Sequence, residues 1–137
     1  MDIKKLQKIH HPSGDVFVFE SEVFNFPVRR VYFIKNVPVG GVRGHHAHKT
    51  LKQILICPHG AVEITLDNGK GLQEKVILDN PDDALYVGPY VWHTMKWMEK
   101  DSVLLVLASD SFNESDYIRQ YSDFLKEITL LSERDQS

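Results

Sequence analysis

Three of the seven histidines in the chain lie within the heptapeptide Arg-Gly-His-His-Ala-His-Lys, residues 43–49. Alternate residues of a β-strand point to the same face, so His46 and His48 are expected to share one face while His45 takes the other. Imidazole exchanges protons near neutral pH, and its neutral form also binds metals. The pair therefore indicates acid–base catalysis or metal binding, and an ordinary surface or core role is the alternative for an isolated H-x-H.

The spacing around this pair resembles the first motif of the cupin superfamily. That motif runs glycine, five residues, H-x-H, three or four residues, glutamate, six residues and glycine. The corresponding residues here are Gly40, His46, His48, Gln53 and Gly60. Metal-binding cupins use the glutamate as a ligand, and non-haem iron sites generally combine two imidazoles with a carboxylate. Because the neutral amide of Gln53 is a poorer ligand, the motif fits a cupin barrel better than a metal centre.

The second cupin motif is also altered. Its histidine should stand five residues after a proline, but counting from Pro89 reaches Thr94, and His93 comes one residue early. Such an offset turns a strand side chain to the other face unless a bulge re-aims it. We therefore expect no metal and no cofactor, and acid–base chemistry by protein groups alone.

The elements that must position these histidines are short strands. Runs of β-branched and aromatic residues, cut by Gly, Pro, Asn and Asp, are typical of an antiparallel sandwich or barrel. The predicted strands are 15–21, 29–37, 51–57, 61–67, 73–79, 83–88 and 102–109. Asn68-Gly69 predicts a hairpin with a two-residue type I′ turn, in which both central residues have positive φ.

The C-terminal part has a different periodicity. The apolar and aromatic residues there recur at helical spacing, with Asn113 and Ser115 as possible caps. They are Tyr117, Ile118, Tyr121, Phe124, Leu125 and Ile128. We expect one amphipathic helix over about residues 114–130, packed on the sheet through this stripe. The fold class is thus predicted as all-β, a cupin-type jelly-roll β-barrel over about residues 14–110 with a short C-terminal α-helix.

Size and composition narrow the functional classes. The 137 residues fit one domain, 1–137, and a net charge of -3 gives no reason to expect nucleic-acid binding. The N-terminal segment lacks an apolar signal-peptide core, and no run approaches the roughly 18 apolar residues that span a bilayer. With Cys57 as the single cysteine, no intrachain disulfide can form. A cytoplasmic protein without membrane partners is expected.

Three separated segments make the chain similar to the dTDP-4-keto-6-deoxyglucose 3,4-ketoisomerases. They are R-G-H-H-A-H-K at 43–49, L-Y-V-G-P-Y-V-W-H at 85–93 and V-L-L-V-L-A-S-D-S-F-N-E-S-D-Y-I-R-Q-Y-S-D-F-L at 103–125. The similarity covers about residues 16–125. It implies a cofactor-free isomerase that moves the carbonyl of a dTDP-linked 4-keto-6-deoxyhexose from C4 to C3 through an enediol.

The resemblance also implies partners. Members of the family are homodimers that exchange N-terminal strands. Their 3-keto product is aminated by a PLP-dependent aminotransferase, and the resulting 3-amino sugars enter O-antigens and S-layer glycans.

Catalytic roles follow from this chemistry, in which a proton leaves C3 and another reaches C4. His46 is our candidate for the group that shuttles this proton, and His48 would relay protons to the sugar oxygens or orient the ring; the two roles could be exchanged. His93 would act as a second acid above the opposite sugar face, and a histidine at this position favours a galacto product. Similar galacto-forming sequences carry an arginine where this chain has Ser13, so the gluco product stays open. A solvated loop histidine is the alternative for His93.

Substrate-binding residues are expected on two strands. Arg43 could grip the pyrophosphate in a bidentate way or neutralise enediolate charge, or form a surface salt bridge. Arg30 and Tyr32, two residues apart on one face, take positions in the ligand cleft by family position, although a strand tyrosine is as often part of a core.

Other functions also fit these residues. A non-catalytic sugar-nucleotide binding module would use the same barrel. A 3,5-epimerase would act on the same substrate by the same first proton abstraction, and a metal-dependent cupin enzyme would use the H-x-H pair as ligands.

Overall fold

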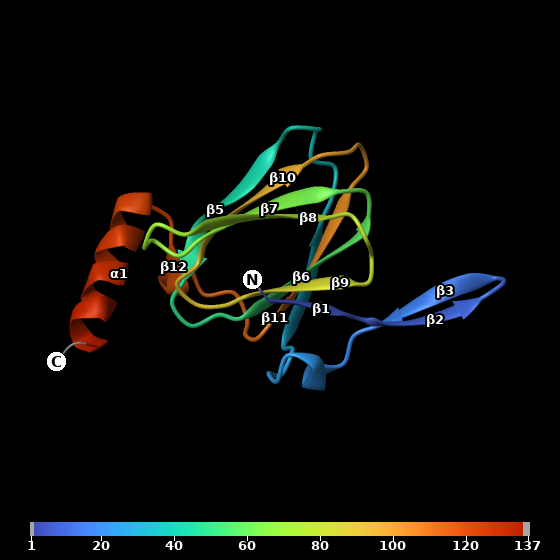
Figure 1. The fold of residues 1–137 in the computed structure, drawn as a ribbon, viewed down its shortest axis with the longest axis horizontal. Coiled ribbons are helices and arrows are strands. Elements are labelled where there is room, and N and C mark those ends of the chain that lie inside the picture. The colour runs from blue at the N-terminus through green and yellow to red at the C-terminus, as the bar shows by residue number, and fades with distance from the viewer. Residues whose placement is uncertain (1, 136–137) are drawn as a thin grey trace.

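Two five-stranded antiparallel sheets face each other in the computed structural model, which describes residues 2–135 (Figure 1). The first sheet has the order β1 (Asp2–Lys5), β9 (Asp83–Val87), β6 (Gln53–His59), β11 (Val103–Ala108) and β4 (Arg30–Ile34). The second has the order β12 (Tyr117–Ile118), β5 (Val42–His48), β10 (Trp92–Trp97), β7 (Val62–Asp67) and β8 (Gln73–Leu78). This arrangement agrees with the predicted all-β jelly roll.

The core lies between the two sheets because alternate strand residues point inward. In β7 the side chains of Val62 and Ile64 are fully buried, whereas Glu63 and Thr65 between them are partly exposed. Burying a side chain of this size contributes about 1.5–3 kcal/mol. Further buried members of this core are Leu55, Leu78, Leu85, Trp97 and Leu104. The core fills one end of the space between the sheets, and the polar residues of the site occupy the other.

A bulge in β5 controls which side chains face inward. Across the β5–β10 pair His46 lies opposite His93 but Gly44 lies opposite Thr94, so His45 is an extra residue. Gly44 and His45 have φ values of 93° and 57°, in the left-handed region that glycine adopts readily. Because the bulge resets the alternation, Arg43 and His46 line the same cavity although they are three residues apart. In a regular strand they would face opposite ways.

The C-terminal helix differs from its prediction. It was expected over about 114–130, but α1 spans Tyr121–Asp135, and residues before it form the 3-10 turn η2 (Glu114–Asp116) and β12. The side chain of Asn113 does act as a cap, accepting a hydrogen bond from the Ser115 N–H, but it caps η2. The Asp116 carboxylate accepts hydrogen bonds from the N–H groups of Thr50 and Leu51, which holds this segment in an extended path beside β5.

Helix α1 packs against the outer face of the second sheet. Phe124 and Ile128 are buried together with Ala47 of β5, and the ring of Trp92 lies 5.7 Å from that of Phe124. The hydroxyl of Tyr121 donates to Asp67 Oδ2 at 2.7 Å, which ties the first turn of the helix to the end of β7. Neither this helix nor any other helical segment within residues 2–135 is long and apolar enough to cross a lipid bilayer.

The N-terminal strands also depart from expectation. The barrel was expected to begin near residue 14, but β1 already pairs with β9 in the first sheet. The predicted strand 15–21 is shorter, as β3 (Gly14–Val18), and pairs with β2 (Gln7–His11) in a separate hairpin. This hairpin projects from the barrel on the side opposite α1, and the 3-10 turn η1 (Ser21–Val23) follows it (Figure 1).

Two further predictions were incomplete. The hairpin at Asn68-Gly69 forms between β7 and β8, but the pairing of Asp67 with Gln73 leaves a longer loop in which Gly69 and Gly71 have positive φ and Asn68 does not. The expected type I′ turn is therefore wrong. Strand β10 was not among the predicted strands, because its sequence Trp-His-Thr-Met-Lys-Trp alternates too weakly in polarity to stand out.

The bulge can be tested with a matched pair of substitutions. Gly44→Ala should lower stability by more than about 2 kcal/mol, because left-handed backbone costs a non-glycine residue about 1–2 kcal/mol and the new Cβ would lie 2.8 Å from the His93 carbonyl oxygen. Gly71→Ala shares the backbone penalty, at φ 91°, but its Cβ meets nothing within 4 Å. Urea unfolding of both variants checks this difference. Equal losses would show that the close approach to β10 contributes nothing.

Candidate functional site

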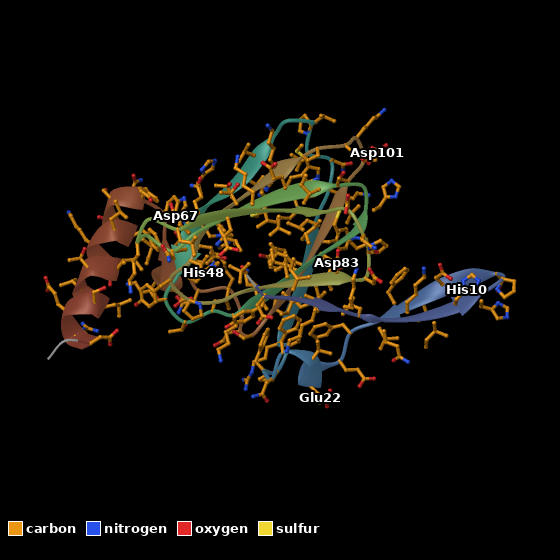
Figure 2. All side chains as sticks on the ribbon, in the orientation of Figure 1. His10, Glu22, His48, Asp67, Asp83 and Asp101 are labelled. Carbon is orange, nitrogen blue, oxygen red and sulfur yellow. The ribbon has the colours of Figure 1, made fainter. Side chains whose placement is uncertain are left out.

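Three imidazoles converge at the end of the barrel near α1. His46 and His48 come from β5 and His93 from the neighbouring β10, and one ring nitrogen of each lies within 4.8 Å of the others. Ring centroids are 4.9 Å apart for His46–His48, 4.7 Å for His46–His93 and 5.5 Å for His48–His93. Figure 2 shows His48 at this end of the space between the sheets. His93 thus faces inward with the pair, and the solvated-loop alternative for it is wrong, since its exposure is only 1%.

Backbone carbonyls orient two of the three rings. His46 Nδ1 lies 3.2 Å from the Gly44 oxygen, and His93 Nδ1 lies 3.0 Å from the Val91 oxygen. A carbonyl only accepts, so each Nδ1 carries the hydrogen and each Nε2 keeps its lone pair. His48 differs, because its Nε2 is buried without a hydrogen-bond partner. The arrangement presents His46 as a base with a fixed tautomer and leaves the tautomer of His48 free to change.

The site holds these imidazoles neutral. Burial, followed by repulsion from His93, lowers the pKa of both His46 and His48 to about 3. Burial also lowers the pKa of His93. At neutral pH all three rings are therefore uncharged and able to accept a proton, which a substrate that develops negative charge next to them would favour.

A cavity of about 380 Å³ opens beside the histidines. Of the residues proposed from sequence, it is lined by His46, His93, Arg43, Arg30 and Tyr32. His48 lies behind this wall, where it contacts His46 and the ring of Tyr117. The structure thus brings all six residues into one neighbourhood, with His48 one layer deeper than the pattern of alternate residues suggested.

Gln53 occupies the place of the cupin glutamate and makes a different contact. Its Nε2 donates to the hydroxyl of Tyr32 at 3.1 Å, and the guanidinium of Arg30 lies 4.8 Å from the centre of the Tyr32 ring. Burial raises the pKa of Tyr32, so the phenol stays protonated. The Gln53 amide therefore helps to hold the Tyr32 side chain in the lining of the cavity.

The three histidines fit a metal only in part. Three imidazole nitrogens could hold zinc. An iron site of the two-histidine, one-carboxylate kind needs an acidic ligand, and within residues 2–135 no carboxylate belongs to this cluster. Gln53, at the place of that ligand, uses its amide nitrogen on Tyr32. The donor set does not match the cupin iron site.

Two residues of the cavity escaped the sequence-based prediction. Tyr117 was expected in the helical stripe, but in β12 its ring lies 5.0 Å from that of His46 and 4.4 Å from that of His48. The Arg119 guanidinium lies 4.5 Å from the centre of the Tyr117 ring and forms two hydrogen bonds to Glu114, at 2.6 and 2.8 Å. The alternation of Tyr117 and Arg119 is the signal for an extended segment, and the apolar helical spacing obscured it.

The remaining histidines lie outside the site. His10 and His11 belong to the projecting hairpin, His59 ends β6, and His45 is exposed at the bulge. The tryptophans serve packing, as Trp97 is fully buried and Trp92 contacts α1.

Comparisons with known proteins show the family of this chain. The family described as "FdtA: WxcM-like, C-terminal" matches residues 1–129. The TDP-4-oxo-6-deoxy-alpha-D-glucose-3,4-oxoisomerase of Aneurinibacillus thermoaerophilus is 44% identical over 117 residues, which are 85% of this chain and 84% of that protein.

Two solved structures show the same fold. The sugar 3,4-ketoisomerase QdtA of Thermoanaerobacterium thermosaccharolyticum, in complex with TDP, has 36% identity and a TM-score of 0.89, covering 93% of both chains. The TDP-quinovose 3,4-ketoisomerase WlaRB of Campylobacter jejuni has 39% identity and a TM-score of 0.86, covering 91% of this chain and 96% of that one.

The lowered pKa values predict acid sensitivity. In the unfolded chain His46 and His48 bind protons near pH 6.5, whereas in the folded chain they stay neutral until about pH 3. The contribution of these two histidines to the free energy of unfolding is fully present above pH 6.5. As the pH drops below 6.5, the free energy of unfolding falls by up to about 1.4 kcal/mol per pH unit for each histidine. Urea midpoints at pH 7 and 5 should differ less in the His46→Asn/His48→Asn double variant than in the wild type. An unchanged difference would contradict the depressed pKa values.

Proposed function

The chain belongs to the FdtA family of WxcM-like, C-terminal proteins, and from this we infer that it is an isomerase that converts a TDP-linked 4-keto-6-deoxyglucose to the 3-keto isomer. The observation that carries the mechanism is the hydrogen bond between His46 Nδ1 and the Gly44 oxygen. This bond leaves a neutral Nε2 directed away from the backbone, beside a cavity large enough for a sugar ring.

His46 is the proton shuttle in our proposal. Its Nε2 takes the hydrogen of C3 as a proton, and the electron pair of the C–H bond forms the C3–C4 double bond while O4 becomes an oxyanion. His48 then carries the proton of the O3 hydroxyl to O4. Finally, His46 returns its proton to C4 and the carbonyl reappears at C3. The atoms balance without a cofactor, and each positioned acid–base group contributes roughly 10²–10⁴-fold.

The assignment of roles to His46 and His48 rests on their surroundings. A group that must act first as a base needs one fixed lone pair, which the Gly44 carbonyl provides for His46. A relay between two oxygens must exchange tautomers, and the unpartnered Nε2 of His48 permits this.

Arg43 is the proposed ligand of the diphosphate. It lies on the rim of the cavity with an exposed side chain, where its planar guanidinium could make two parallel hydrogen bonds to phosphate oxygens.

His93 is the proposed second acid. It contacts His46 from the neighbouring strand and could serve as an additional proton donor to the sugar. Return of the His46 proton to C4 on the face from which the C3 proton was taken would give the galacto configuration, so we propose the galacto product over the gluco product. The resulting 3-keto group is chemically suited to amination, so we place a PLP-dependent aminotransferase after this enzyme.

We also propose a homodimer that exchanges N-terminal strands. An isolated two-stranded hairpin is marginally stable in water, yet β2 and β3 project with exposed Ile9, Val16 and Phe17. An apolar groove of about 540 Å³ borders the outer face of the first sheet. It is lined by Leu6, Phe17, Phe19, Ser21, Val28, Val31, Ile56, Pro58, Pro81, Leu105 and Leu107. A second copy of the hairpin could fill this groove.

The reaction can be followed directly. Dialysis against EDTA followed by a proton NMR time course in heavy water with TDP-4-keto-6-deoxyglucose should give a 3-keto product. This product carries deuterium at C4 in the fraction of turnovers in which the proton on His46 exchanges with solvent before it is returned. The ring couplings would distinguish galacto from gluco. His46→Asn should reduce the rate by about 10²–10⁴-fold, because it removes the shuttle. His45→Asn, on the opposite face of the same strand, should keep the wild-type rate.

Three outcomes would redirect this proposal. Substrate binding without hydrogen exchange at C3 would favour a sugar-nucleotide binding module. Exchange at both C3 and C5 without movement of the carbonyl would indicate a 3,5-epimerase. Activity lost with EDTA and regained with iron or zinc would replace the proton shuttle with metal chemistry.

A charged substitution in the β2–β3 hairpin tests the proposed dimer. Phe17→Asp should shift the sedimentation coefficient from that of a dimer to that of a monomer, because it buries a carboxylate in the proposed interface. Val39→Asp is the matched control, since Val39 is also exposed but lies outside the hairpin and the groove. A wild-type monomer, or a Phe17→Asp dimer, would contradict the exchange.

A further inference from the structure

Arg30 is a partly buried cation that lacks an anion. Its Nε is buried without a hydrogen-bond partner, and within residues 2–135 only one other buried side-chain nitrogen or oxygen shares this state, His48 Nε2. No described carboxylate forms an ion pair with Arg30. A buried guanidinium Nε without a hydrogen-bond partner is unfavourable unless a ligand supplies one.

Aromatic rings fix the position of this guanidinium. It lies 4.8 Å from the centre of the Tyr32 ring and 5.9 Å from that of Phe112, and it lines the cavity beside His46 and His93. Its positive charge also contributes to the low pKa of His48. Arg30 Nε and His48 Nε2, the two buried atoms without a hydrogen-bond partner, therefore belong to side chains that interact electrostatically. Both are at the end of the cavity where the reacting carbons would lie.

The other arginines of the cavity have different surroundings. Arg119 already binds the carboxylate of Glu114 through two hydrogen bonds. Arg43 is exposed at the rim, where water solvates its charge. Arg30 alone among the arginines of this cavity has a buried Nε without a partner, so an anion held there would gain most from the low local dielectric.

We propose that Arg30 is a catalytic residue that binds the O3 and O4 atoms of the enediolate and stabilises its negative charge. This proposal rests on the isomerase function inferred above. When C3 loses its proton to His46, the charge develops on O4 and passes to O3 as the hydroxyl proton moves. Both oxygens lie on the same side of the planar C3–C4 double bond, a spacing that the two N–H groups of a guanidinium fork can match.

Arginine suits this role for a second reason. A guanidinium has a pKa above 12 and does not release its proton at the oxyanion. It therefore stabilises the charge without competing with the transfer between His46 and the two carbons. The same positive charge also contributes, after burial and His93, to the lowered pKa of His48.

Kinetics and nucleotide binding together separate this role from diphosphate binding. Arg30→Gln should lower kcat about 10²–10³-fold, the range found when an oxyanion donor is removed. Its dissociation constant for TDP, measured by titration calorimetry, should stay within about twofold of the wild type, and its melting temperature should not fall. Arg43→Gln is the comparison variant, and it should weaken TDP binding about tenfold, which Arg30→Gln should not do.

Chemical rescue adds a second readout. Guanidinium ion at millimolar concentration should restore part of the activity of Arg30→Ala and none of the activity of His46→Asn. Exchange of the C3 hydrogen into heavy water should fall in Arg30→Gln as much as kcat does, because the oxyanion forms in that step.

Two results would overturn the assignment. If Arg30→Gln lost TDP affinity in proportion to activity, Arg30 would be a diphosphate ligand. If it kept the wild-type kcat, or failed by unfolding while guanidinium left Arg30→Ala inactive, its role would be structural. A wild-type protein that does not isomerise the substrate would instead refute the proposed function itself.

Discussion

The pairing of β5 with β10 across the bulge at Gly44 and His45 is the contact on which the site depends. It allows Arg43 and His46 to face the same cavity, and it sets His93 opposite His46. The carbonyl of Gly44 also selects the tautomer of His46. One local break in a regular ladder thus fixes the direction, the neighbours and the tautomer of the proposed base. The close approach of Gly44 to the His93 carbonyl is the steric reason that this position has no side chain.

The barrel provides a dry environment that stabilises the fold and tunes the chemistry. Apolar side chains fill the space between the sheets, and the polar side chains of the site occupy its remaining end. Burial there keeps the imidazoles neutral and leaves two polar atoms unsatisfied. Such groups lower stability in the absence of a ligand. Holding these groups in position before a substrate enters therefore lowers the free energy of unfolding.

Much of the fold and part of the site were predictable from sequence. Period-2 runs located seven of the strands, and the motif around His46 indicated both the cupin barrel and the pair of histidines that faces into it. Strand β10 was not predicted because Trp92 and Trp97 are apolar on opposite faces, one against α1 and one in the core. Tyr117 was assigned to the helix because its spacing matched the stripe, whereas pairing with His48 places it in β12. These errors arise where contacts distant in sequence override a local pattern.

The position of β10 in the middle of its sheet has a consequence for how such enzymes diversify. Its backbone is paired on one side with β7 and on the other with β5, so the main chain at His93 is fixed whatever side chain it carries. The side chain itself has a single hydrogen bond, to the carbonyl of Val91. One codon change at this position would therefore alter the side chain beside His46 while leaving the barrel and the proposed base on β5 intact. The fold therefore lets the proposed second acid vary while the proposed base keeps its position.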